Sequence, residues 1–166
     1  GVVSIDDYAF YDCNALKFLT IGASVTSIGK YAFSRCPHLG NNQDLEYSVI
    51  IPDSVVNIGD YAFDSCFFLR SVRIGNGVTI IGKNVFSGCG FLKTVIIGNS
   101  VTIIGDNAFS SCWDLETVSI PDSVTIIGDD AFSGCSGLDS VSIGNSVTTI
   151  GVYAFYGCSG LETVSI

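Results

Sequence analysis

Basic residues are scarce in this sequence. Seven Lys and Arg residues stand against sixteen Asp and Glu residues, so the formal net charge is −9, and the basic residues form no cluster. Proteins that bind nucleic acids or anionic membrane surfaces carry a concentrated positive patch. We therefore expect no nucleic acid partner.

Long apolar runs are also missing. No segment approaches the roughly 20 apolar residues that a membrane-spanning helix needs. Gly1 is not followed by the basic and apolar regions of a signal peptide. We expect no direct membrane insertion, and any signal peptide or anchor to have been removed or to lie outside this sequence.

Methionine is absent and proline occurs three times, whereas there are 19 glycines. Hydrophobic residues make up 48% of the chain and charged residues 14%. This balance excludes a disordered tail and predicts a well-packed interior. Such an uneven composition is typical of a repeated template.

The repeat is visible in three sets of residues that share one spacing. An Ala-Phe pair, once Val-Phe, recurs with a period of about 23 residues that is lengthened once, and a Cys and a Leu follow at the same steps. One coil of this length cannot bury its own apolar face, so we expect these residues to point inward and to stack as columns between neighbouring coils. The expected core residues are Phe10, Phe33, Phe63, Phe86, Phe109, Phe132 and Phe155, with Cys13, Cys36, Cys66, Cys89, Cys112, Cys135 and Cys158.

Within one repeat, Leu138, Val141 and Ile143 alternate with Ser140 and Ser142, which predicts a half-buried strand. The segment from Gly128 to Cys135 reads as a short helical or 3₁₀ turn. The predicted fold class is an α/β repeat solenoid, coiled to the right, with one parallel β-sheet on its concave face and short helical or 3₁₀ turns opposite. Residues 1–166 would form a single solenoid of about seven coils, with an enlarged second repeat.

The pattern LxxVxI, followed by SVTxIGxxAFxxC, closely resembles the BspA-like leucine-rich repeats of bacterial and protist surface proteins. The resemblance extends over the whole chain. It implies an extracellular or cell-surface location and a role in adhesion, through binding of host, matrix or other surface proteins. The motif is specific for the fold but not for a ligand, because core columns do not determine what the exposed positions bind.

Residues with reactive side chains fit structural roles. The seven cysteines occupy one template position without any C-x-x-C pair, which favours a buried ladder of thiols, although an occasional bridge between adjacent coils stays open. The single histidine, His38, is expected in a solvent-facing loop, and Asp129-Asp130 at a solvated edge. No phosphate-binding loop, nucleophile motif or calcium loop is present. We therefore expect no enzyme activity, metal or cofactor.

Candidate ligand contacts concentrate in the first three coils. Outward strand positions of later coils carry mostly Ser and Thr, whereas the early coils carry larger side chains there. The one longer step comes from seven additional residues, Gly40 to Glu46, which are either tolerated divergence or a ligand-contacting loop. The predicted contact residues are Phe18, Asn41, Asn42, Tyr47, Ile50, Arg70 and Arg73.

The position after the template Leu changes charge along the chain. It is basic early and acidic late, in the order Lys17, Tyr47, Arg70, Lys93, Glu116, Asp139, Glu162. The sequence also begins inside a repeat and stops at a strand residue, which fits a fragment of a longer array or copies that stack end to end. We expect a module for surface adhesion or protein binding, with a self-stacking structural solenoid as the alternative.

Overall fold

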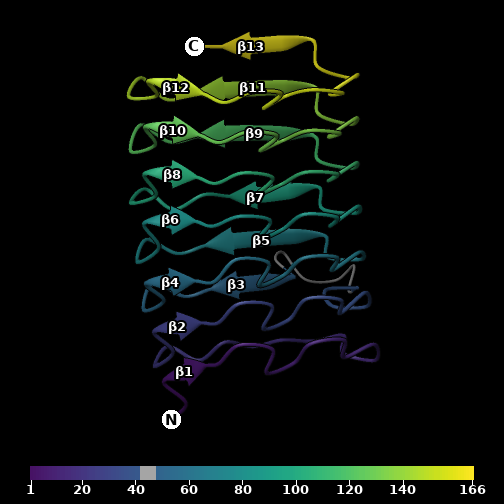
Figure 1. The fold of residues 1–166 in the computed structure, drawn as a ribbon, viewed down its shortest axis with the longest axis vertical. Helices are drawn as coiled ribbons and strands as arrows, with labels where there is room; N and C mark the ends of the chain where they lie inside the picture. The colour runs from purple at the N-terminus through teal and green to yellow at the C-terminus, as the bar shows by residue number, and fades with distance from the viewer. Residues whose placement is uncertain (42–47) are drawn as a thin grey trace.

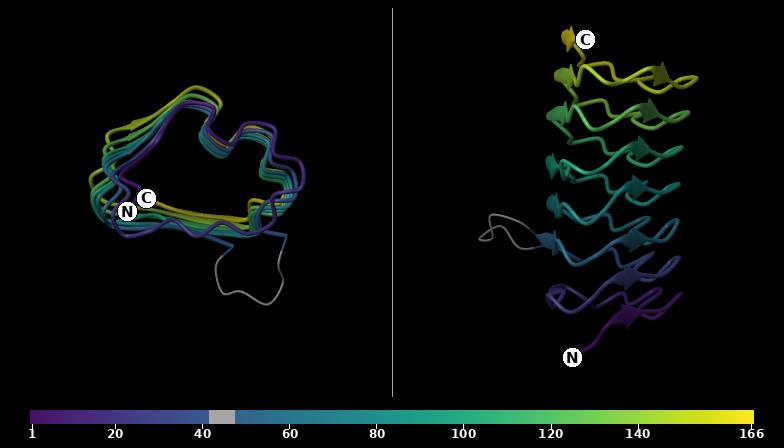
Figure 2. Two further views of the ribbon diagram at one scale, coloured as in Figure 1. Left: turned by 90° about the horizontal axis from the view of Figure 1, so that it is seen from below. Right: turned by 90° about the vertical axis from the view of Figure 1, so that its left-hand side faces the viewer.

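The chain forms a β-solenoid of about seven turns, in a computed structural model that describes residues 1–41 and 48–166. The coils stack along one axis, from the amino end at the bottom of Figure 1 to the carboxyl end at the top. In the end view of Figure 2, the outlines of successive coils superimpose. Equivalent positions of neighbouring coils therefore lie next to each other.

The strands form two walls. One wall is a six-stranded parallel sheet in the order β13-β11-β9-β7-β5-β3. Its strands are β3 (Val49–Ile51), β5 (Ser71–Ile74), β7 (Thr94–Ile96), β9 (Thr117–Ile120), β11 (Ser140–Ile143) and β13 (Thr163–Ser165).

The second wall consists of two-residue strands in two parallel sheets, ordered β1-β2-β4 and β12-β10-β8-β6. These strands are β1 (Ser4–Ile5), β2 (Ser27–Ile28), β4 (Asn57–Ile58), β6 (Ile80–Ile81), β8 (Ile103–Ile104), β10 (Ile126–Ile127) and β12 (Thr149–Ile150). The sequence pattern predicted one sheet and not this second wall, because a two-residue strand is too short to show an alternating pattern.

Strand register repeats the sequence period. Val118 pairs with Val141, and Ile120 with Ile143, so each residue faces its equivalent one repeat further along. Ser27 pairs with Asn57 across the enlarged repeat, where the partner lies further away in the sequence. The strand register is therefore the same before and after the insertion, and residues at equivalent template positions pair on both sides of it.

The expected α/β class with helical or 3₁₀ turns is wrong, since the described residues contain no helix. In the second coil, Tyr31 and Arg35 adopt positive φ angles of 55° and 58°, which a right-handed helix does not tolerate. The N–H of Phe33 donates to the carbonyl of Ala62 in the next coil at 2.8 Å. The segment is a pair of tight turns whose remaining donors bond to the neighbouring coil.

The interior contains one continuous stack of phenylalanine rings. Rings of adjacent coils lie nearly parallel, with centroids 5.1 to 5.4 Å apart. Each such contact adds about 0.5–1.5 kcal/mol beyond burial of the ring. Five of the rings have 0% exposure, whereas Phe155 is half-buried and Phe10 is 43% exposed: the five are Phe33, Phe63, Phe86, Phe109 and Phe132.

The glycine of the recurring Ile-Gly pair lets coils approach closely at a corner. A Cβ on Gly128 would lie 2.7 Å from the backbone nitrogen of Asp106 in the preceding coil. Any side chain there would push the two coils apart. This close approach explains why the template carries glycine immediately after its buried isoleucine.

Replacing Phe109 with Ala should lower the free energy of unfolding by about 3–5 kcal/mol, because it leaves a cavity in the middle of the ring stack. Phe10→Ala removes a half-exposed ring from the same template position, and should cost about 1–2 kcal/mol. Urea unfolding of both variants measures the difference. If both variants lost the same free energy of unfolding, the idea that a buried ring of the stack contributes more than an exposed one would be contradicted.

Candidate binding surface

Five ring-bearing side chains gather at one corner of the solenoid, immediately before the six-stranded wall. Each follows a template cysteine by one or two positions. The corresponding positions of the last two coils carry Ser136-Gly137 and Ser159-Gly160, so the repeat itself does not require a large side chain here. We call this set the aromatic corner: His38, Phe67, Phe68, Phe91 and Trp113.

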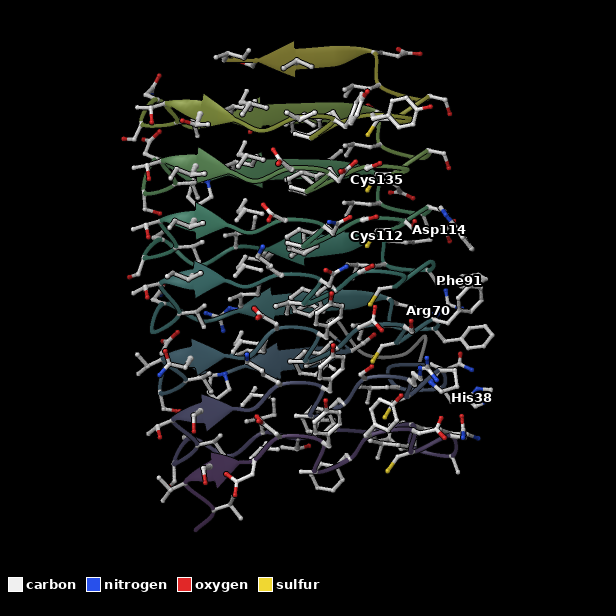
Figure 3. All side chains as sticks on the ribbon, viewed as in Figure 1. His38, Arg70, Phe91, Cys112, Asp114 and Cys135 are labelled. Carbon is white, nitrogen blue, oxygen red and sulfur yellow. The ribbon has the colours of Figure 1, made fainter. Side chains whose placement is uncertain are left out.

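The rings of the aromatic corner contact one another across coils. His38 stacks on Phe68 with centroids 5.5 Å apart, and Phe68 stacks on Phe91 at 5.1 Å. Phe67 forms edge contacts with Phe91 and Trp113 at 5.2 and 5.7 Å. Figure 3 shows His38 and Phe91 projecting from the same edge of the stack. The corner is therefore one connected surface.

Gly90 allows Trp113 to join this surface. A Cβ on Gly90 would lie 2.9 Å from the Trp113 indole and 3.0 Å from the Phe67 ring. The missing side chain leaves space for the larger indole of the next coil. Trp113 is nevertheless 49% exposed, which makes it the most prominent apolar side chain of this corner.

Arg70 lies against the same corner. Its guanidinium carbon is 5.9 Å from the centroid of the Phe91 ring, within the range of a cation–π contact. Its Nε is buried and has no hydrogen-bond partner among the described residues. Figure 3 shows Arg70 next to Phe91 on this edge.

The predicted contacts Ile50 and Arg73 lie side by side on the outer face of the six-stranded wall. Ile50 pairs with Arg73, and Arg73 with Ile96, in consecutive strands β3, β5 and β7. Ile50 and Ile96 are 46% and 41% exposed. In the later strands this row continues with Ser119, Ser142 and Ser165, so the apolar part belongs to the early coils.

Of the remaining predicted contacts, the structure describes Phe18 and Asn41. Phe18 is 64% exposed and Asn41 is also exposed. Gly40 donates its N–H to the carbonyl of Lys17 at 2.9 Å, so Asn41 and Phe18 follow neighbouring segments. Asn42 and Tyr47 lie outside the described residues.

Phe67, Phe68, Phe91 and Trp113 were not predicted as surface residues from the sequence, whereas the outward position of Ile96 in its strand was expected and is confirmed. One signal was present: the two residues between the template Cys and Leu are large in the middle coils and small in the last two. The Phe67-Phe68 pair and the single Trp both fall there. Only stacking of the coils shows that these residues come together.

The column of changing charge runs beside the aromatic corner. Backbone N–H groups of Lys93, Glu116, Asp139 and Glu162 each donate to the carbonyl of the equivalent residue one coil earlier. Lys93 and Glu116 form an exposed ion pair at 3.4 Å. The acidic residues at this position therefore occupy three successive coils next to the aromatic corner.

The seven cysteines are free thiols in one column. Five are buried, and Cys13 and Cys158 are partly exposed. Each thiol from Cys36 onward donates to the carbonyl of a phenylalanine in a preceding coil, as Cys112 does to Phe86 at 3.3 Å. These thiols act as structural hydrogen-bond donors between coils.

Burial of the thiol column disfavours the thiolate form. Burial raises the pKa of Cys36 to about 11, and raises the pKa values of Cys66, Cys89 and Cys112 above the ordinary thiol range. For Cys135 and Cys158, a contact with the neighbouring thiol is the main cause of a raised pKa. A nucleophilic cysteine needs a lowered pKa, so these six thiols are poorly suited to that chemistry.

Among residues 1–41 and 48–166, no three His, Cys, Asp or Glu side chains are grouped as a metal ion would require. The same part of the chain contains no helix long and apolar enough to cross a membrane.

Comparison with known proteins gives one consistent result. The sequence matches the family described as BspA type leucine rich repeat region, in six copies, over residues 1–112 and 41–162. No curated protein matches it.

Solved structures share the fold over nearly the whole chain. A leucine-rich repeat protein from Bacteroides ovatus ATCC 8483 is 29% identical, with a TM-score of 0.75, over 98% of this chain and 46% of that protein. The leucine-rich repeat protein of T. pallidum is 29% identical, with a TM-score of 0.71, over 99% of this chain and 63% of that one. A leucine rich cell surface protein from Faecalibacterium prausnitzii A2-165 is 25% identical, with a TM-score of 0.53, over 99% of this chain and 57% of that one. This chain thus spans less than two thirds of each of these proteins.

Thiol labelling should distinguish Cys13 from the buried cysteines. With an aromatic disulfide reagent at neutral pH, Cys13 should react fast in the folded protein and the buried thiols at least about 100-fold more slowly, because they must wait for local opening. Cys158 is also partly exposed but has a raised pKa, so it should react at an intermediate rate. Cys13→Ser should remove the fast phase, Cys158→Ser should remove the intermediate one, and all seven thiols of the wild type should react in guanidinium. Fast labelling of Cys89 or Cys112 in the folded protein would contradict their burial.

Stability should fall in alkaline solution because of the thiol column. The folded pKa values are raised, so unfolded thiols release protons first, and stability that is complete below pH ~9 is lost as the pH rises toward 11 and beyond. Each such thiol contributes a slope of at most about 1.4 kcal/mol per pH unit. Cys89→Ala with Cys112→Ala should make the decline shallower than in the wild type, when urea unfolding is measured from pH 8 to 11. Parallel declines would contradict the assignment, since the tyrosines and lysines titrate in both proteins.

Proposed function

Because the chain belongs to the family of BspA-type leucine-rich repeat proteins, we propose that it is a non-catalytic module that binds other proteins at a cell surface and so supports adhesion. The observation that carries this proposal is the aromatic corner. Its rings occupy template positions that are filled with Ser and Gly in the last two coils. Because the fold does not require rings at these positions, we infer that they serve binding.

The chemistry of the aromatic corner suits a protein interface. Aromatic residues and arginine are enriched at the centres of such interfaces, where a few large side chains supply most of the binding free energy. Here the half-exposed Trp113 indole contacts Phe67, which contacts Phe91, and Arg70 lies over the Phe91 ring. Trp113 is exposed, and Phe67, Phe68 and Phe91 are partly exposed. A connected apolar patch that reaches the surface in this way is typical of a binding surface.

The scaffold would present this corner without rearrangement. The residues between the template Cys and Leu are held by backbone hydrogen bonds to the preceding coil: Phe68 donates to Pro37, Phe91 to Phe67 and Asp114 to Gly90, at 2.9 to 3.1 Å. The backbone that carries these rings is therefore held in place before a partner binds. A prearranged surface loses less conformational entropy on binding.

The apolar row formed by Ile50, Arg73 and Ile96 supports the same proposal. Its exposed isoleucines lie on β3 and β7 of the six-stranded wall, and only Leu92 and Lys93 separate β7 from Phe91 of the aromatic corner. A partner that covers both would contact the early and middle coils. The surface location is supported by the relative from Faecalibacterium prausnitzii, which is described as a cell surface protein.

The test replaces the rings of the aromatic corner with the residues that the last two coils carry at the same template positions. A variant with Phe67→Ser, Phe68→Gly, Phe91→Gly and Trp113→Ser carries the residue types of the last two coils. Binding of the wild-type chain to a panel of immobilised matrix and host surface proteins should identify a partner, and the variant should bind that partner at least about tenfold more weakly, because hot-spot rings each contribute about 1 kcal/mol or more. Biolayer interferometry measures both.

A control variant, Tyr153→Asn with Tyr156→Ser, removes two exposed rings elsewhere, which are 64% and 67% exposed. It should leave binding within twofold of the wild type. No binding to any protein of the panel, or equal binding of all three proteins, would overturn the proposed function. Thermal melts show that each variant is folded.

A further inference from the structure

We propose that the aromatic corner, together with the acidic residues that continue from it, binds a basic, extended segment of the partner protein. This rests on the proposed function and adds the chemistry of the partner. The acidic residues are Asp114, Glu116, Asp139 and Glu162, which we call the acidic column.

The aromatic corner and the acidic column adjoin along the solenoid axis, and we call the two sets together the ridge. Trp113 and Asp114 are consecutive residues, and Glu116, in the same coil, is the first acidic residue at the position after the template Leu. The N–H of Asp139 donates to the carbonyl of Glu116, and that of Glu162 to Asp139, both at 2.9 Å. The ridge therefore runs along the solenoid axis from the rings of the middle coils to the carboxylates of the late coils.

The carboxylates at the end of this ridge have few positive neighbours. Glu116 pairs with Lys93 at 3.4 Å, whereas no ion pair is formed by Asp139 or Glu162 in the described part of the chain. Both are exposed, and they occupy adjacent coils about 4.8 Å apart along the sheet. Like charges at this spacing repel each other, and a cation placed between them removes that repulsion.

The aromatic rings favour a cationic side chain over a neutral one. Two guanidinium groups of the chain already lie over aromatic rings: Arg70 over Phe91 at 5.9 Å and Arg35 over Tyr11 at 5.8 Å. Trp113 offers the strongest π-face of the natural aromatic side chains, is half exposed, and adjoins Asp114 in the sequence. An arginine from a partner can therefore stack on the indole and pair with a carboxylate at once.

The length of the ridge fits an extended segment. From Phe67 to Glu162 it crosses four coil steps, which is about 19 Å at the spacing of parallel strands. An extended chain covers that distance with about six residues. The net charge of −9 also attracts a basic partner over longer range.

The probe for this proposal is a labelled octapeptide of alternating Arg and Ser, compared with one of alternating Glu and Ser. Fluorescence anisotropy should show binding of the arginine peptide to the wild-type chain, weakened about tenfold between 50 and 300 mM salt, and no binding of the glutamate peptide. Trp113 is the single tryptophan, so its emission in an unlabelled titration should change with the same affinity.

Two variants separate the parts of the ridge. Trp113→Ser, and the triple change Glu116→Gln, Asp139→Asn and Glu162→Gln, should each weaken the arginine peptide at least fivefold. The control removes the same charge from other surfaces, through Asp6→Asn, Asp12→Asn and Asp130→Asn, and should weaken it less than twofold. Absence of arginine-peptide binding, or equal loss in the control triple, overturns the proposal.

A soluble oligosaccharide serves as a second probe. If it perturbs the Trp113 emission while the arginine peptide does not, the corner binds glycans and the proposal is wrong. Failure of this inference is distinct from failure of the proposed function. Suppose that a protein of the panel binds the wild-type chain but not the variant with the aromatic corner reverted, and that neither the triple acidic change nor salt weakens its binding. The proposed function would then hold, and a basic segment as the binding partner would be excluded.

Discussion

Hydrogen bonding between successive coils is the constraint on which the rest of the structure depends. Each coil satisfies its backbone groups largely through its neighbours, both in the strands and in the turns around the Ala-Phe pair. Each strand residue pairs with the residue at the same template position in the next coil, so equivalent side chains lie next to each other. Columns of identical residues, including the phenylalanine stack and the thiol ladder, are the direct consequence.

The same constraint separates positions that the fold needs from positions that it leaves open. A phenylalanine, a small residue at the close corner and a thiol donor recur because each contacts the equivalent residue or backbone of a neighbouring coil. The two residues after the cysteine lie outside these columns and accept anything from glycine to tryptophan. The aromatic corner is therefore a surface that the scaffold supports without requiring it, and that is where a binding property can change without loss of stability.

Much of this arrangement is readable from the sequence, and part of it is not. The Phe and Cys columns and the six-stranded wall follow from spacing and alternation, and the recurring motif identifies the repeat family. The turns around Tyr31 and Arg35 were wrongly expected to be helical, because a tyrosine or arginine gives no sign that it adopts a positive φ. Ile50 and Arg73 were correctly predicted as outward residues of the strands. No prediction was made for Phe67, Phe68, Phe91 and Trp113, because residues between the template Cys and Leu follow no repeated pattern.

The sequence by itself determined the period and the residues that stack, because each depends on residue type at a fixed interval, and its composition determined the excess of acidic over basic residues. The tertiary structure decided which bonds the turns make, that two walls of strands form, and that His38, Phe68, Phe91 and Trp113 meet on one surface. The physical reason is distance along the chain: these four rings belong to four different repeats, and only the stacking of coils brings them within contact.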